Sequence, residues 1–169
     1  MAATARSRRS APDRDQLADE LADRLLDPRD DVQPIVLSHK IGRSGKWSVT
    51  VIWDRWSGLS MQDRTEIIYL ANEKRQEPAD IAIATGLAID EAINLGYLPY
   101  QIQTARMRTD QVTLAELRKA MIAEGALPTS TGPQLRYVTE EAAVVAYRRL
   151  QTRLPGPYWM IVKEVFRDS

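Results

Sequence analysis

The side chains that most often carry out catalysis are scarce in this sequence. Its 169 residues include no cysteine and a single histidine, His39. Thiol nucleophiles, disulfides and cysteine-ligated iron–sulfur clusters are therefore excluded within the chain, as are zinc sites that need two or three histidines. A histidine has an ordinary pKa of about 6.5 and can serve as a general base or a ligand. An enzymatic site would therefore require His39 and a carboxylate in one cleft.

Four pairs of acidic residues adjoin in the sequence, and acid–base catalysis needs two acids at a defined separation with different pKa values. The pairs are Asp19-Glu20, Asp30-Asp31, Asp90-Glu91 and Glu140-Glu141. Adjacent residues of a helix point in different directions, and acids in a first helical turn are already explained by the helix dipole. The glycine-rich motifs that bind phosphate are also missing. The sequence predicts no catalytic residue, no metal site and no cofactor.

Trp56 and Arg64 are the first candidates for contact with another protein. Trp56 follows an expected strand at a corner of the chain, where we expect its ring to pack under the following helix, with a partly exposed ring that anchors a partner as the alternative. Tryptophan and arginine are frequent anchors of protein interfaces. The leading hypothesis is a small cytoplasmic adaptor or regulatory module without enzymatic activity that binds a protein partner. Edge strands also allow a homodimer. No apolar run reaches the roughly 18 residues that span a bilayer, so we expect no membrane partner.

Arginine-rich segments support an alternative hypothesis, binding of nucleic acid, in particular RNA. Arg136 and Tyr137 lie on an expected strand, and Arg149 and Arg153 share one face of the following helix. Arginine suits phosphate groups and tyrosine can stack on a base. Residues 1–12, expected to be a disordered basic tail, add Arg6, Arg8 and Arg9. Because 23 basic residues balance 23 acidic ones, such binding would have to be local.

The hydrophobic spacing predicts the elements that position these residues in the N-terminal part of the chain. They are a helix at 15–27, strands at 34–40 and 47–53 joined as a hairpin, a helix capped by Ser60 and ending near 75, a strand at 80–85 and a short helix capped by Asp90. In the second strand, alternation places Trp47, Val49, Val51 and Trp53 on one buried face.

The C-terminal part is predicted to continue as β-α-β-α-β. The expected elements are a strand at 98–105, a helix opened by the capping box at Thr113 and Glu116, a loop at 127–134, a strand at 134–138, a helix capped by Thr139 and a strand at 158–165. Parallel and antiparallel pairing both remain open. The predicted class is α+β, with one domain at 13–103 and a smaller one at 104–169 packed on it; the boundary lies in the polar segment 104–110.

The N-terminal part resembles the BolA family. Ser38-His39 stands before the hairpin loop, and the segment from Val51 to Arg64 carries the aspartate, aromatic, glycine, serine and arginine of the family pattern V-x-x-D-x-F-x-G-x-S-x-x-x-R, with Trp56 at the aromatic position. The resemblance implies an α-β-β-α-β-α order close to a KH module. The family's helix motif R-H-R is replaced by Arg64-Thr65-Glu66, and residues 83–85 supply no histidine ligand. The resemblance therefore implies the shape and not iron–sulfur chemistry.

Overall fold

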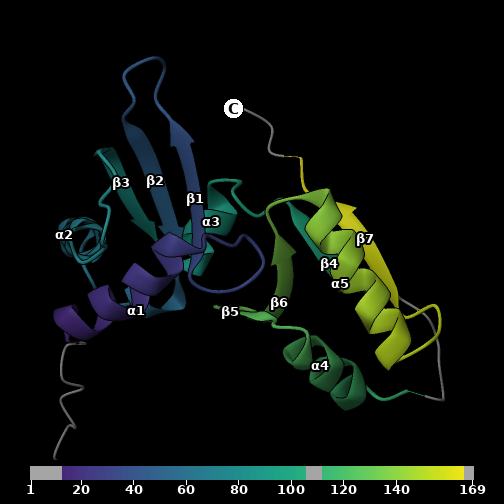
Figure 1. Cartoon of the computed structure of the whole chain (residues 1–169). Coiled ribbons are helices and arrows are strands. Elements are labelled where there is room, and N and C mark those ends of the chain that lie inside the picture. Colours follow the sequence, from purple (N-terminus) through teal and green to yellow (C-terminus); the bar gives the residue numbers. More distant parts are fainter. Residues whose placement is uncertain (1–12, 106–111, 166–169) are drawn as a thin grey trace, which may run out of the picture.

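The structure, a computed structural model, describes residues 13–105 and 112–165 and combines helices with two β-sheets (Figure 1). This confirms the predicted α+β class. The predicted basic tail, residues 1–12 with Arg6, Arg8 and Arg9, lies outside the described residues.

The N-terminal half runs from α1 to α3 and contains the first sheet. Its elements are α1 (Arg14–Leu26), β1 (Ile35–Lys40), β2 (Trp47–Ile52), the 3-10 helix η1 (Asp54–Trp56), α2 (Met61–Glu73), β3 (Ile81–Leu87) and α3 (Ile89–Asn94). The strand order is β1-β2-β3, with β1 antiparallel and β3 parallel to β2. β1 and β3 are therefore the edge strands of this sheet.

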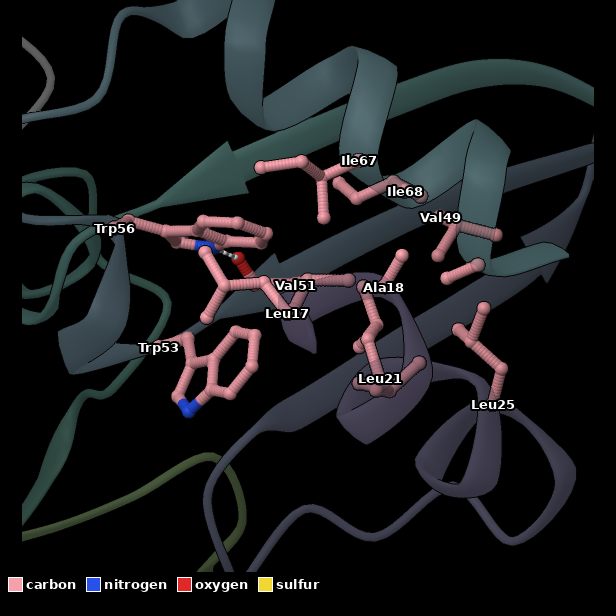
Figure 2. Close-up of a cluster of buried hydrophobic side chains, with 12 residues drawn as sticks. Leu17, Ala18, Leu21, Leu25, Val49, Val51, Trp53, Trp56, Ile67 and Ile68 are labelled. Carbon is pink, nitrogen blue, oxygen red and sulfur yellow. Dashed lines mark hydrogen bonds between the residues drawn. The ribbon is translucent and has the colours of Figure 1, made fainter. Parts of the chain in front are cut away.

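Helices α1 and α2 cover one face of the first sheet because alternate residues of β2 point toward them. Val49 and Val51 of β2 and Trp53 just after it are buried against Leu17 and Leu21 of α1 (Figure 2). Partly buried Trp47 packs against the same cluster. The predicted buried face of this strand is confirmed. On the opposite face Ile52 is fully buried as well, because the C-terminal half covers that end of the sheet.

The C-terminal half contains the second sheet. Its elements are β4 (Tyr100–Thr104), α4 (Leu114–Ala123), β5 (Leu127–Thr129), β6 (Gly132–Tyr137), α5 (Glu140–Arg153) and β7 (Trp159–Lys163). The strand order is β5-β6-β4-β7 and every pair is antiparallel. A β-α-β-β-α-β chain with this strand order is the ferredoxin-like split βαβ arrangement. Helices α4 and α5 pack on one face, around a core that includes Ile102, Leu135 and Leu150.

The predicted loop at 127–134 is wrong, since these residues form the hairpin of β5 and β6. Pro128 and Pro133, which suggested a loop, lie opposite each other in the antiparallel pair. Pro128 is tolerated because β5 is the edge strand of its sheet, and Pro133 comes before the residues of β6, 135–137, that pair with β4. The turn is closed by Thr129, whose hydroxyl donates to the carbonyl of Gly132 at 2.6 Å. Gly132 has φ +110°, which disfavours other residue types.

Three of the four predicted helix caps are confirmed, and the fourth, for α3, is wrong. Ser60, Thr113 and Thr139 each accept a backbone N–H bond at the start of α2, α4 and α5, as predicted. Asp90, the predicted cap of α3, instead lies in the first turn after Ala88. The carboxylate of Glu91 accepts the N–H of Ala88 at 2.8 Å and satisfies this helix start.

The two halves lie side by side and share an apolar cluster (Figure 1). We call it the junction cluster; it consists of Ile35, Ile52, Leu87, Ile89, Ala92, Leu98 and Leu127, with Leu37, Ile93 and Val138 packed against it. The chain passes from the first sheet to the second between α3 and β4. This passage comes before the predicted boundary at 103/104, because β4 pairs with β6 and β7.

Gly86 is predicted to be intolerant of a side chain. A β-carbon at this position would lie 2.6 Å from Cβ of Arg64 and 3.3 Å from Cε2 of Trp56. Gly86→Ala should therefore lower the free energy of unfolding by about 1–3 kcal/mol through overpacking, measured by urea denaturation. Ala82→Ser, at an exposed position of the same strand, is the control and should change it by less than about 0.5 kcal/mol. Equal stability of Gly86→Ala and wild type would contradict the packing described.

Candidate functional site

Trp56 is fully buried, as expected if its ring packs under the following helix, and it is not the partly exposed ring that a contact with a partner would use. Its indole N–H donates to the carbonyl of Val51 at 3.0 Å, and its ring meets that of Trp53 edge-on with centroids 5.2 Å apart (Figure 2). The 3-10 turn η1 folds the ring back under α2 instead of outward. In this structure Trp56 holds a helix on the sheet and presents no surface to a partner.

Arg64, the second predicted contact residue, is also buried. Its Nε donates to the carbonyl of Leu59 at 3.0 Å, and its Nη1 donates to the carbonyl of Gly86 at 3.1 Å and to Glu91 at 2.5 Å. These bonds satisfy a guanidinium that packing has removed from water. Arg64 therefore ties α2 to β3 and α3, and its guanidinium is engaged within the fold.

The predicted nucleic-acid surface is not assembled as one face. Arg136 and Tyr137 point to opposite sides of β6, and both are buried. Arg136 donates to the carbonyl of Leu98 at 3.4 Å and to Glu164 at 2.9 Å, whereas Tyr137 packs under α5. Burial, reinforced by the nearby carboxylate of Glu124, raises the pKa of Tyr137 to about 12. Neither side chain presents the exposed surface that the nucleic-acid hypothesis requires of it.

Arg149 and Arg153 are exposed and share a carboxylate. Glu124 is only 5% exposed and accepts from Nε of Arg149 at 3.0 Å and from a terminal nitrogen of Arg153 at 3.2 Å. Arg148 and Thr152 complete a shallow surface depression of about 470 Å³ beside them. Sequence inspection missed Glu124, since its place at the end of α4 gives no sign that α5 lies against it.

A groove lies between the two halves, with a volume of about 780 Å³. One wall is β1, from Val36 to His39, together with the loop residues 28–31. The other wall is α5 and its cap, through Thr139, Glu141, Ala142, Val145 and Arg149. Val145 is a large apolar side chain that is 48% exposed in this groove. We call this feature the β1–α5 groove.

The edge of β1 that faces this groove carries unused backbone hydrogen-bonding groups. The N–H of Val36 donates to the carbonyl of Arg29 at 3.2 Å, so even-numbered residues of β1 point their backbone groups away from β2. Ser38 is the next outward residue along this edge. Neither its N–H nor its carbonyl bonds to another residue of the described segments. Sequence inspection singled out the neighbouring His39 and not this backbone position.

His39 lines the β1–α5 groove together with three carboxylates. Asp30, Asp31 and Glu141 belong to the same lining, and the imidazole is exposed. Within the described residues it makes no hydrogen bond to any of them. Asp31 instead binds Arg29 at 2.8 Å, and hydrogen bonding to that guanidinium lowers the pKa of Asp31. The groove therefore brings together the residue types of an acid–base site without pairing them.

Comparison of the sequence with models of known protein families finds no match, and comparisons with curated proteins and with solved structures find none either. No helix of residues 13–105 and 112–165 is long and apolar enough to cross a membrane. In the same residues, no group of three or more metal-binding side chains is placed to hold an ion.

The Arg64–Glu91 pair predicts a dependence of stability on pH. The hydrogen bond from Arg64 is the main cause that lowers the pKa of Glu91 below its ordinary value of 4.5. The pair therefore stabilises the fold fully above pH 4.5, and this contribution is lost as the pH falls and the carboxylate is protonated. Because Glu91 is 44% exposed, Glu91→Gln should lower the free energy of unfolding at neutral pH by only about 1 kcal/mol.

Urea denaturation of both proteins at neutral pH and at pH about 3 measures this effect, and their difference should shrink at the lower pH. Glu77→Gln removes an exposed carboxylate that has no ion pair within the described residues and is the matched control. A difference for Glu91→Gln that stays constant over this pH range would contradict the role given to the ion pair.

Proposed function

We propose that this chain is a small cytoplasmic adaptor or regulatory module, without catalytic activity of its own, that binds an extended segment of another protein. The segment adds to the first sheet as a strand beside β1 and lies in the β1–α5 groove. The observation that carries this proposal is the unpaired, outward-facing backbone of Ser38 at a groove about 780 Å³ in volume. A free sheet edge inside a groove is a common docking place for extended peptides.

The opposite wall of the groove supports this proposal. The exposed side chain of Val145 on α5 offers an apolar contact, and Leu37 on β1 lines the same groove. In strand addition, backbone bonds give affinity and pockets for alternate side chains give specificity. Ser38 would supply the backbone bonds, and these two apolar residues would contact side chains of the added segment.

The charges of the groove favour a basic segment. Three carboxylates and two arginines line it, and Asp30 and Glu141 are in no ion pair with a described residue. Arg29 and Arg149 are already held by Asp31 and Glu124. A lysine or arginine of the partner would therefore meet uncompensated negative charge. Complementary charge of this kind increases the association rate and the specificity of binding.

The BolA-like character of the N-terminal half is part of this proposal. The order from α1 to α3, with β1 antiparallel and β3 parallel to β2, supports it. We propose that the N-terminal half has the shape of that family, and we do not propose its iron–sulfur chemistry. The scaffold presents β1 at the edge of the sheet.

Removing the backbone N–H of residue 38 by substitution with proline tests the proposed strand addition. Peptide ligands are first selected against the wild-type protein from a displayed library of random sequences, and their affinities are measured by calorimetry. Ser38→Pro removes the outward N–H, which makes no bond within β1 and β2, so the edge strand should keep its fold. Its affinity for the selected peptides should fall about tenfold or more.

Ser38→Ala is the matched control, since it removes the hydroxyl and keeps the N–H; its affinity should stay within about threefold of wild type. The selected peptides should be rich in lysine or arginine. Peptides that bind Ser38→Pro as tightly as wild type would refute strand addition at β1. Loss of a wild-type dimer in Ser38→Pro would instead identify a second copy of the chain as the occupant.

Nucleic-acid binding remains the second candidate, and the exposed arginines of α5 favour it. Arg148, Arg149 and Arg153 surround one carboxylate, Glu124, which leaves this surface cationic. Its effect should be electrostatic, because the two residues expected to add specific contacts, Arg136 and Tyr137, are buried. Sequence-independent contacts of this kind weaken steeply with salt.

A mobility-shift assay with single-stranded RNA at low salt tests this candidate. Wild type should shift the RNA, and combined Arg149→Ala and Arg153→Ala substitutions should weaken the shift roughly tenfold, with a smaller salt dependence. Arg29→Ala is the control for the loss of one positive charge elsewhere, since Arg29 lies in the N-terminal half, in the wall of the β1–α5 groove. No shift by wild type at low salt would remove nucleic acid from consideration.

A further inference from the structure

A second pocket lies under the C-terminal end of α1, on the helix-covered face of the first sheet. Its volume is about 340 Å³. Most of its lining is apolar and comes from Leu25 and Leu26 of α1 and from Trp47, Val49 and Ile81 of the sheet. Pockets of this size and composition, with a few placed polar groups, are typical of small-molecule sites.

The charged side chain of this lining is Arg75, just after α2. Within the described residues its side chain makes one hydrogen bond, from Nη1 to Oδ1 of Asn72 at 3.3 Å. Its Nε is shielded from water and has no partner. Although Glu73, Glu77 and Asp80 are near in sequence, none forms an ion pair with Arg75 in the described structure. A guanidinium without a counter-charge beside an apolar pocket would be stabilised by an anionic ligand.

Asn72 holds this guanidinium in place. It is buried, and its side-chain amide both donates to the carbonyl of Ala79 at 2.8 Å and accepts the N–H of Ala79 at 3.0 Å. These two bonds fasten the turn that follows α2. The arginine is therefore attached to a fixed support at the pocket wall, which lowers the entropy that binding would cost.

We propose that this pocket binds a small amphipathic organic acid. The carboxylate of the ligand pairs with the terminal nitrogens of Arg75, and its hydrocarbon part lies among Leu25, Trp47 and Ile81. Arginine binds carboxylates with paired, charge-assisted hydrogen bonds. The volume of about 340 Å³ restricts the ligand to a short or medium chain. The pocket shares Pro28, Val36 and Ser38 with the wall of the β1–α5 groove, but the proposed binding of an acid does not depend on strand addition.

Sodium octanoate and octan-1-ol are matched probes, since they share a chain length and differ in charge. Binding is followed by NMR through the indole N–H signals of the four tryptophans, because Trp47 lines the pocket and Trp159 lies in the other half. We expect octanoate to shift the Trp47 signal saturably and to leave that of Trp159 unchanged. Octan-1-ol should bind about tenfold more weakly or worse, because it cannot pair with Arg75.

Arg75→Gln should weaken octanoate about tenfold or more and abolish its advantage over octan-1-ol. Arg118→Gln makes the same change of charge at an exposed position of α4 and should leave both affinities within about twofold. Ala79→Leu adds bulk to the pocket wall without altering charge, so it should weaken both probes together. This third variant keeps the test decisive if Arg75→Gln proves unstable.

The proposal is overturned if octanoate produces no saturable shift of Trp47, if it binds wild type no better than octan-1-ol, or if Ala79→Leu leaves its affinity unchanged. Octanoate affinity that persists in folded Arg75→Gln would likewise overturn the assignment of Arg75. These measurements use Arg75, Ala79 and the Trp47 signal, none of which lines the β1–α5 groove, so strand addition can fail while this site stands, and the reverse.

Discussion

The junction cluster is the interaction on which the rest of the molecule depends. It places Ile35, the first residue of β1, and Leu127, the first of β5, in one apolar contact between the halves. Burying an aliphatic side chain of this size contributes roughly 1.5–3 kcal/mol. Val138, just before the cap of α5, packs against the same cluster. The junction cluster therefore fixes the start of β1 and the start of α5, which form the two walls of the β1–α5 groove.

This junction also explains how β1 remains an edge strand. The loop that follows α1 closes one end of β1 through the bond from Val36 to Arg29, and the second half stands off from the remainder. Exposed strand edges invite unwanted pairing, and proteins usually shield them with loops, charges or neighbouring elements. The opposing wall of α5 restricts access to the backbone of Ser38 without bonding to it. An edge guarded in this way favours a single extended chain over a broad sheet surface.

Both halves bury an arginine by the same means. Arg64 and Arg136 each donate to a backbone carbonyl, of Gly86 and of Leu98, and each forms an ion pair with a partly exposed glutamate. A buried guanidinium is tolerated only when its donors find acceptors. The arginines that reach solvent on α5 are in turn shared by one buried carboxylate. The distribution of charge on the surface therefore differs greatly from the distribution along the chain.

Residue types and local spacing determined most helices, the buried face of β2 and the lack of thiol chemistry, because caps and periodicity act over a few neighbouring residues. The β5–β6 hairpin escaped prediction, since a segment with two prolines resembles a loop. The burial of Arg64 and Tyr137, the groove beside Ser38 and the uncompensated charge of Arg75 were decided by tertiary structure alone. Exposure of a polar or aromatic side chain depends on partners distant in sequence, and no local pattern specifies them.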